Sequence, residues 1–104
     1  MGTMIPLLRV DDSFLLTGRG LTVIYECILP DSCKFPFEDE VHLVTQEQTR
    51  QTVRCTFELA FVRRRNPPPY VVSMIFENMG KDDIPPGMVI EVAKSTYDRL
   101  HESG

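Results

Sequence analysis

The chain has 104 residues, of which 42% are hydrophobic, and a formal net charge of −4. A chain of this size forms one domain and buries most of its apolar side chains in a single core. Its acidic balance argues against general binding of nucleic acid or anionic membranes, which needs a cationic field, and no apolar run approaches the ~20 residues of a membrane-spanning helix.

Apolar and polar residues alternate with period two along most of the chain, which predicts β-strands. The first strand pair is expected in Phe14–Val23, on either side of a glycine turn, and the second strand continues to residue 29. Residues 53–61 repeat the alternation, and shorter examples occur at Val41–Val44 and Val71–Phe76. No helical pattern of 10–15 residues lies between them. We therefore predict an all-β fold: a single closed, antiparallel, Greek-key-like β-barrel, because closure removes exposed sheet edges.

Glycines mark the turns between these strands. Gly18 and Gly20 flank Arg19, and we expect at least one of the two glycines to have a positive φ. Gly87 follows two prolines and is expected to form a further turn into the last strand. Beyond it, residues 94–104 form a polar tail in which Ser95–Asp98 has the character of a capping box and predicts a short helix. Such a helix needs Tyr97 or Leu100 to pack on the barrel.

The segment Arg63–Tyr70 contains three adjacent arginines followed by three prolines. Prolines lack the N–H of a central strand, so the segment is predicted to be a stiff, extended connection between two strands. Two interpretations remain open. The segment is either a solvated loop or a docking segment, with Arg63, Arg64, Arg65 and Tyr70 as candidate partner-binding residues. Adjacent residues of an extended chain alternate sides, so at most two of the arginines face one ligand.

The residue types needed for catalysis or metal binding are scarce. His42 alternates with apolar neighbours and is interpreted as an outward polar position, and His101 lies in the tail. The cysteines at positions 27, 33 and 55 lack Cys-x-x-Cys spacing, which favours free thiols in a reducing compartment. Acidic clusters at residues 11–12, 38–40 and 82–83 are expected at strand ends and turns. We therefore predict no enzyme activity, no cofactor and no metal site, in a cytoplasmic protein of bacterial type without a signal peptide.

Five segments between Pro6 and Ala93 resemble, in order and spacing, the second domain of the translational GTPases, typified by elongation factor Tu. They are Pro6–Phe14, Gly18–Gly20, Phe37–Leu43, Cys55–Leu59 and Asp82–Gly87. The resemblance implies a β-barrel over residues 6–93, with an N-terminal extension at 1–5 and the tail at 94–104. It also implies a role near tRNA, the ribosome or a translation factor.

The chain also departs from that family. It has no Gly-x-x-x-x-Gly-Lys-Ser/Thr loop, so we expect no GTP binding. Glu77 and Asn78 stand where the family has Arg-Gly, and Pro86 stands where it has a basic residue. Those family cations face the acceptor end of tRNA, and an acid and a proline remove the electrostatic basis of that contact.

These observations lead to two functional hypotheses. The first is a non-catalytic, stand-alone binding module associated with the translation machinery, with Arg19 among its candidate partner-binding residues. The alternative is a protein-interaction or regulatory domain unrelated to translation, which docks through the Arg63–Tyr70 loop. Partners in either case are a protein or RNA, and not a membrane.

Overall fold

The computed structural model describes residues 3–16, 18–27, 34–59 and 70–101. Within these ranges the chain forms seven strands, a single turn of 3-10 helix and one short α-helix. The strands are β1 (Met4–Arg9), β2 (Phe14–Leu16), β3 (Gly20–Cys27), β4 (Phe37–Val44), β5 (Arg50–Leu59), β6 (Tyr70–Phe76) and β7 (Val89–Ala93). The helices are η1 (Lys81–Asp83) and α1 (Lys94–Leu100).

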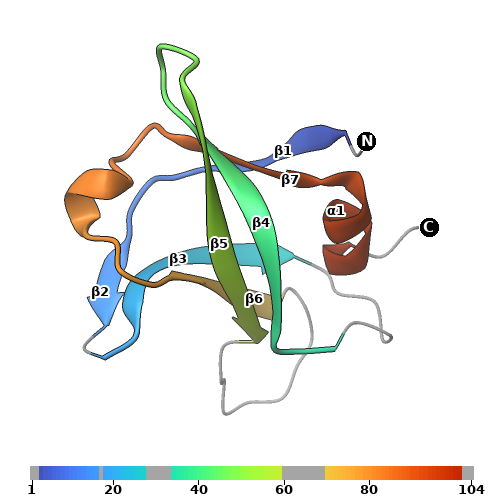
Figure 1. Ribbon diagram of the computed structural model, residues 1–104. Coiled ribbons are helices and arrows are strands. Elements are labelled where there is room, and N and C mark those ends of the chain that lie inside the picture. The colour runs from blue at the N-terminus through green and yellow to red at the C-terminus, as the bar shows by residue number, and fades with distance from the viewer. Residues whose placement is uncertain (1–2, 17, 28–33, 60–69, 102–104) are drawn as a thin grey trace.

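All the strands belong to one antiparallel sheet with the order β1-β7-β4-β5-β6-β3-β2. Strands β4, β5 and β6 are consecutive neighbours, and β7 returns to lie beside β4, which is the Greek-key arrangement. The sheet curls strongly. In Figure 1, β1 and β7 lie above the core and β3 and β6 lie below it, with the long β4–β5 hairpin crossing in front.

The predicted closure of the barrel is wrong, because the sheet is a curled half-barrel. The two edge strands, β1 and β2, do not pair with each other in the described part of the chain, although residues 10–13 connect them directly. The backbone between them forms hydrogen bonds with the segment that precedes β7. The Val10 N–H donates to the Met88 carbonyl at 2.8 Å, and the Val10 carbonyl accepts from the Gly87 N–H at 2.8 Å. These two bonds attach the segment to the approach to β7 instead of joining the edges.

The hydrophobic core lies inside the curl. It receives side chains from β3, β4, β5, β6, β7 and α1, and the alternation in the sequence selects the inward face of these strands. Its largest fully buried side chains are Phe57, Phe76, Leu21, Leu43, Met74, Ile84, Ile90 and Leu100. Cys55 is also buried in the core, as the alternation predicted.

Three positions depart from the predicted alternation. Thr22 and Ile75 are on the outward sides of β3 and β6, yet each is only 3% exposed. They lie opposite each other in the β3–β6 register. Leu59 is predicted to be inward but is exposed, at the end of β5.

The tail forms α1, which packs against β1 and β7. Leu100 is fully buried, and the Thr96 hydroxyl donates to the Asp39 carboxylate on β4. The predicted capping box is wrong: the N-cap is Ala93, two residues before Ser95, and no side chain caps the helix. The helix has the length of about two turns, so its stability comes from this packing.

His101 follows α1 and is held by two contacts. Its Nε2 lies 2.5 Å from the Tyr25 hydroxyl, and its Nδ1 lies 2.6 Å from the Tyr97 carbonyl oxygen. Because the carbonyl only accepts, Nδ1 carries a proton and donates to it. The ring also lies against that of Tyr97, with centroids 4.0 Å apart. The end of the helix is therefore fixed to β3 through Tyr25.

The glycine predictions are confirmed in stronger form. Gly18 and Gly20 both have positive φ, at 80° and 121°, and Gly87 has a φ of 96°. The Arg19 N–H donates to the Leu16 carbonyl at 3.0 Å, which closes the turn between β2 and β3. A Cβ at Gly20 would lie 2.5 Å from the Phe76 carbonyl oxygen, whereas a Cβ at Gly18 would meet nothing within 4 Å. Gly20 is therefore required twice, for its backbone angle and for the close approach of β6.

Neither of the described helices is long and apolar enough to cross a membrane.

Candidate binding groove

Two hollows that share lining residues lie on the described surface. The first has a volume of about 480 Å³ and lies between β5 and the segment that links β6 to η1. The second has a volume of about 550 Å³ and lies beside β2. Both are lined by Glu77, Asn78 and Met79, and we call the two hollows together the groove.

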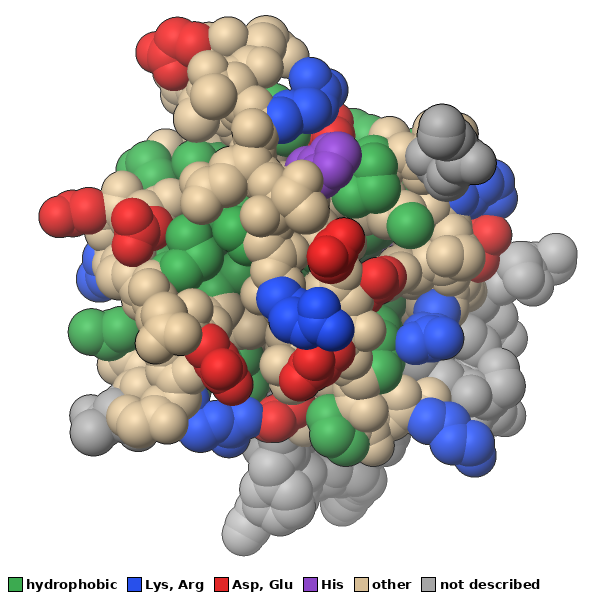
Figure 2. Space-filling view, viewed as in Figure 1, with side chains coloured by type: hydrophobic (Ala, Val, Ile, Leu, Met, Phe, Trp, Pro, Cys, Tyr) green, Lys and Arg blue, Asp and Glu red, His purple; other side chains and the backbone are tan. Residues whose placement is uncertain are grey.

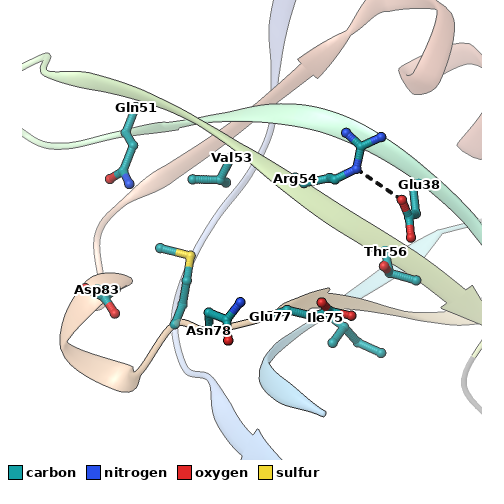
Figure 3. Close-up of a pocket in the computed structure, with 10 residues that line it drawn as sticks. Glu38, Gln51, Val53, Arg54, Thr56, Ile75, Glu77, Asn78 and Asp83 are labelled. Carbon is teal, nitrogen blue, oxygen red and sulfur yellow. Dashed lines mark hydrogen bonds and ion pairs between the residues drawn. The ribbon is translucent and has the colours of Figure 1, made fainter.

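The groove opens where two neighbouring strands separate. Strands β5 and β6 pair only from Thr56 to Leu59 on β5, while β5 continues along β4 back to Arg50. The chain leaves β6 after Phe76 through a turn in which Asn78 has a φ of 63°. In Figure 3, β5 with Gln51 and Val53 therefore lies on one side of the opening, and the link from β6 to η1 lies on the other.

The first hollow is lined by three apolar side chains among charged and polar ones. Val53, Ile75 and Met79 supply the hydrophobic lining. Glu38 and Arg54 form an ion pair of 3.1 Å on the rim, drawn as a dashed line in Figure 3. Figure 2 shows hydrophobic side chains in the hollow beside β5 and charged side chains around it. A polar rim around an apolar centre is the usual composition of a protein-binding surface.

Two exposed apolar side chains of β2, Leu15 and Leu16, line the second hollow. Phe14, Leu15 and Leu16 form the whole of β2 and are 50%, 61% and 44% exposed. Ile24 on the neighbouring β3 is also exposed. Scattered exposed hydrophobic residues are normal, but a contiguous set of this kind marks an interaction site.

Arg19 leaves the turn after β2 and forms an ion pair of 2.5 Å with Glu58 on β5. Strands β3 and β6 lie between the turn and β5 in the sheet, so this pair bridges elements that are not neighbours. Thr22 on β3 and Ile75 on β6 are outward side chains that are nonetheless buried. The Thr22 hydroxyl has no hydrogen-bond partner among the described residues.

Most cations of the described chain are neutralised by nearby acids. Arg19, Arg50, Arg54, Lys81 and Lys94 each lie within 4.0 Å of a carboxylate oxygen. Figure 2 accordingly shows acidic and basic side chains intermixed over β4 and β5, and no continuous basic patch on that face. By contrast, Asp11, Glu77 and Asp82 have no ion pair with any described cation, so the end of the groove near β2 and η1 is acidic.

The structure places one of the sequence-predicted partner-binding residues in the groove. Arg19 lines the second hollow, together with Gly18 and Gly20. Arg63, Arg64 and Arg65 lie outside the described residues, as does the side chain of Tyr70, whose backbone begins β6. Sequence reasoning missed the groove itself, although the unbroken apolar run Phe14–Leu16, which does not alternate, was a signal for an exposed strand.

A second polar cluster lies on β4, β5 and β7, away from the groove. Glu91, only 8% exposed, accepts from the Arg50 guanidinium at 3.3 Å through both carboxylate oxygens. His42 lies beside it, with Nδ1 at 3.6 Å from the carboxylate. His42 is half-buried and lies on the opposite face of β4 from the buried Val41 and Leu43, which agrees with the predicted outward polar position. No described nucleophilic side chain contacts this cluster.

Few side chains of the kinds common in catalytic and metal sites lie in the groove. The lining of the groove contains no His, Cys or Ser among the described residues. Burial in the core raises the pKa of the Cys55 thiol far above its ordinary value, so this thiol is protonated and unreactive. In the part of the chain that the structure covers, no group of three metal-ligating side chains comes together.

No protein-family model, curated protein or solved structure matches the chain in our comparisons. The binding properties of the groove are therefore inferred from the residues that line it.

Proposed function

We propose that the chain is a non-catalytic binding module that holds a protein partner in the groove. The observation that carries this proposal is that the two hollows share lining residues. Glu77, Asn78 and Met79 line both the first hollow, which also has Val53 and Ile75 in its lining, and the second hollow beside the exposed apolar strand β2. A hollow of several hundred Å³ beside exposed hydrophobic side chains is a recurring form of binding site.

The charges around the groove favour protein over RNA. Binding of a phosphate backbone gains free energy when free Lys and Arg side chains release counterions. Here Arg19 and Arg54, the two cations that line the groove, are paired with Glu58 and Glu38. Glu77, which lines both hollows, adds an unpaired negative charge.

The translation machinery is the first place to seek the partner. Support comes from the resemblance of the five segments to the second domain of translational GTPases, and that domain is a β-barrel. The left-handed backbone at Asn78, where that family has a glycine, and the positive φ of Gly18 and Gly20 are consistent with this resemblance. We therefore propose a factor or ribosomal protein as the partner, without GTP binding by this chain.

The proposal is tested by affinity capture from native lysate, with proteins, ribosomes and RNA scored separately. Glu77→Arg places a bulky cation in the shared part of the groove, and Glu47→Arg makes the same charge change in the exposed β4–β5 turn as a matched control. We expect a protein that the parent and Glu47→Arg capture equally and that Glu77→Arg loses. Equal capture by all three chains refutes a groove-bound partner.

Docking through the Arg63–Tyr70 loop is the second candidate. The observation in its favour is Leu59, which is 46% exposed at the end of β5 where this loop begins. Leu59 also lines a further hollow with Phe35, Pro36 and Glu58. Replacing Arg63, Arg64 and Arg65 with Ala separates the alternatives. Loss of a captured protein indicates loop docking, and loss of a steeply salt-dependent RNA interaction indicates phosphate contacts.

A further inference from the structure

The two edges of the sheet differ in how they are protected against pairing with another chain. An edge strand presents unpaired N–H and C=O groups, and proteins block such edges with proline, charge, bulges or a covering element. β1 has Pro6, an irregular register between Pro6 and Leu8, the exposed Arg9 and contact with α1. β2 has none of these in the described chain, and all three of its side chains are apolar and exposed.

We propose that β2 is a docking edge for an extended peptide segment that adds to the sheet as an eighth strand. The segment carries apolar side chains at alternate positions and Lys or Arg at its ends. This inference rests on the proposed function and specifies how the partner protein enters the second hollow. Strand addition of this kind obtains affinity from main-chain hydrogen bonds and specificity from alternate side chains.

The backbone and the side chains of β2 both suit this role. β3 is its one hydrogen-bonded neighbour among the described strands, so the other side of β2 is open to pairing. Alternation places Phe14 and Leu16 on one face of the strand and Leu15 on the other. An added strand would therefore bury apolar side chains on both faces of the sheet, and Leu15 and Leu16 would guide one of its side chains into the second hollow.

The charges near β2 decide the chemistry of the partner. Asp11 and Asp12 directly precede the strand and are exposed, and Glu77 lines the hollow beside Leu15 and Leu16. Lys81 lies 3.9 Å from Asp12 and is followed by two acids in η1, and Arg19, which also lines the hollow, is paired with Glu58. The excess of negative charge attracts a cationic segment and repels an acidic one.

The same features argue against a second copy of this chain as the occupant. A strand of three residues buries far less than the roughly 1,000 Å² expected of a stable interface. Two copies paired through β2 would also bring their acidic segments together at the same edge. A short basic peptide has neither difficulty, because the hollow adds contact area beyond the strand.

The test uses the whole chain and a labelled synthetic peptide, acetyl-Arg-Lys-Val-Ser-Leu-Ser-Val-Lys-Arg-amide. Fluorescence anisotropy gives its Kd, and amide chemical shifts of the ¹⁵N-labelled protein locate the site. We expect saturable binding, with the largest shifts at residues 14–16. Leu15→Lys should weaken it by about tenfold or more, whereas Thr49→Lys, which adds the same charge in the exposed β4–β5 turn, should leave Kd within about twofold.

Two control peptides isolate the two parts of the inference. Replacing the Arg and Lys residues at both ends of the peptide with Glu should abolish binding, because the acidic groups near β2 then repel the peptide. N-methylation of alternate amides should abolish it through the lost main-chain bonds, because charge and side chains are kept. The inference is overturned by no saturable signal at about 1 mM peptide, by equal affinity of the N-methylated peptide, or by shifts away from β2.

These results are separable from the test of the proposed function. If the peptide fails to bind while Glu77→Arg still releases a captured protein, strand addition is wrong and the groove keeps its function. If the peptide binds at β2 but no protein is captured through the groove, the edge has the inferred property and the proposed function fails. Concentration-dependent dimerisation that Leu15→Lys abolishes would assign the edge to a second copy and overturn the peptide inference.

Discussion

β1 and β2 are consecutive along the chain, yet they form opposite edges of one sheet and have opposite surfaces. β1 has six residues, is interrupted by a register shift after its proline, and contacts the C-terminal helix. β2 has three residues, a regular register with β3 and three exposed apolar side chains. The features that block pairing with another chain are therefore found on the long edge strand, β1. The short edge strand, β2, lacks them and lies beside the groove.

Strand length accounts for part of this difference. A long, flat, apolar edge is a site of aggregation, so β1 needs a proline and a bulge to be tolerated. A three-residue edge offers too few backbone groups to start indiscriminate pairing. It therefore retains hydrophobic side chains and takes a partner only where the adjoining groove adds contact area.

The largest effect is expected at the turn that positions the open edge. Gly20→Val introduces a β-branched side chain at a φ of 121° and places a Cβ 2.5 Å from the Phe76 carbonyl oxygen. We expect a loss of about 4 kcal/mol in the free energy of unfolding, because backbone strain and a clash with β6 add. Urea denaturation monitored by circular dichroism measures it.

Gly18→Val is the matched control in the same turn. A Cβ there meets nothing within 4 Å, so only the strain of the positive φ remains, at about 1–2 kcal/mol. Equal losses for the two variants would contradict the role given to the approach of β6 to Gly20.

The next effect concerns the covered edge. Leu100 is fully buried where α1 packs against β1 and β7. Leu100→Ala should cost about 3 kcal/mol, from lost burial and the cavity left behind. Amide hydrogen exchange in β1 and β7 should then become faster than the loss of global stability alone explains. Exchange in β2 should change only by the amount that the loss of global stability explains. Uniform acceleration across the sheet would mean that the helix does not protect the β1 edge in particular.

Period-two alternation was sufficient to predict most of the sheet and its core. Cys55, Phe57, Val72 and Met74 are all buried as their spacing required. The glycine turns followed equally from local chemistry, because a positive φ is a property of single residues. These predictions succeeded where neighbours in sequence determine the environment.

Features that depend on distant segments were not predictable in this way. Thr22 and Ile75 are buried although the alternation places them outward, and Arg19 pairs with Glu58 although the two are 39 residues apart in sequence. The open barrel depends on Val10 bonding to the approach to β7. The groove arises because β5 extends beyond its pairing with β6. The alternation of residues in a strand is the same whether or not a neighbouring strand is present, so it did not predict the groove.

A pH titration tests whether the two edges share one cooperative core. Burial raises the pKa of Cys55, which lies on central strand β5. The folded chain keeps this thiol protonated while the unfolded chain ionises above the ordinary value of 9.0. Stability is therefore complete below pH 9 and falls above it, by about 1.4 kcal/mol per pH unit for one thiol.

Cys55→Ala provides the control for other groups that titrate in the same range. The difference in unfolding free energy between parent and variant should narrow between pH 9 and 10. If the difference in unfolding free energy did not depend on pH, Cys55 would ionise as easily in the folded chain as in the unfolded chain. The centre of the sheet would then open as readily as its edges.

The smallest effect on stability, and the most direct test of the comparison, comes from exchanging the characters of the two edges. Leu15→Lys gives β2 the charge of a protected edge, and the double variant Pro6→Val, Arg9→Val gives β1 the bare apolar surface of an unprotected one. All three positions are exposed, so each change should alter the unfolding free energy by only about 0.5 kcal/mol.

The property expected to change is the self-association of the protein. Static light scattering against concentration should show more attraction between molecules for the β1 double variant, because its outer edge then resembles a long apolar strand. Leu15→Lys should show slightly less attraction than the parent, since β2 is too short to associate strongly by itself. If the double variant stays as monomeric as the parent, the bulge and α1 already block β1 without help from Pro6 and Arg9, and the difference between the edges lies in their covering elements and not in these side chains.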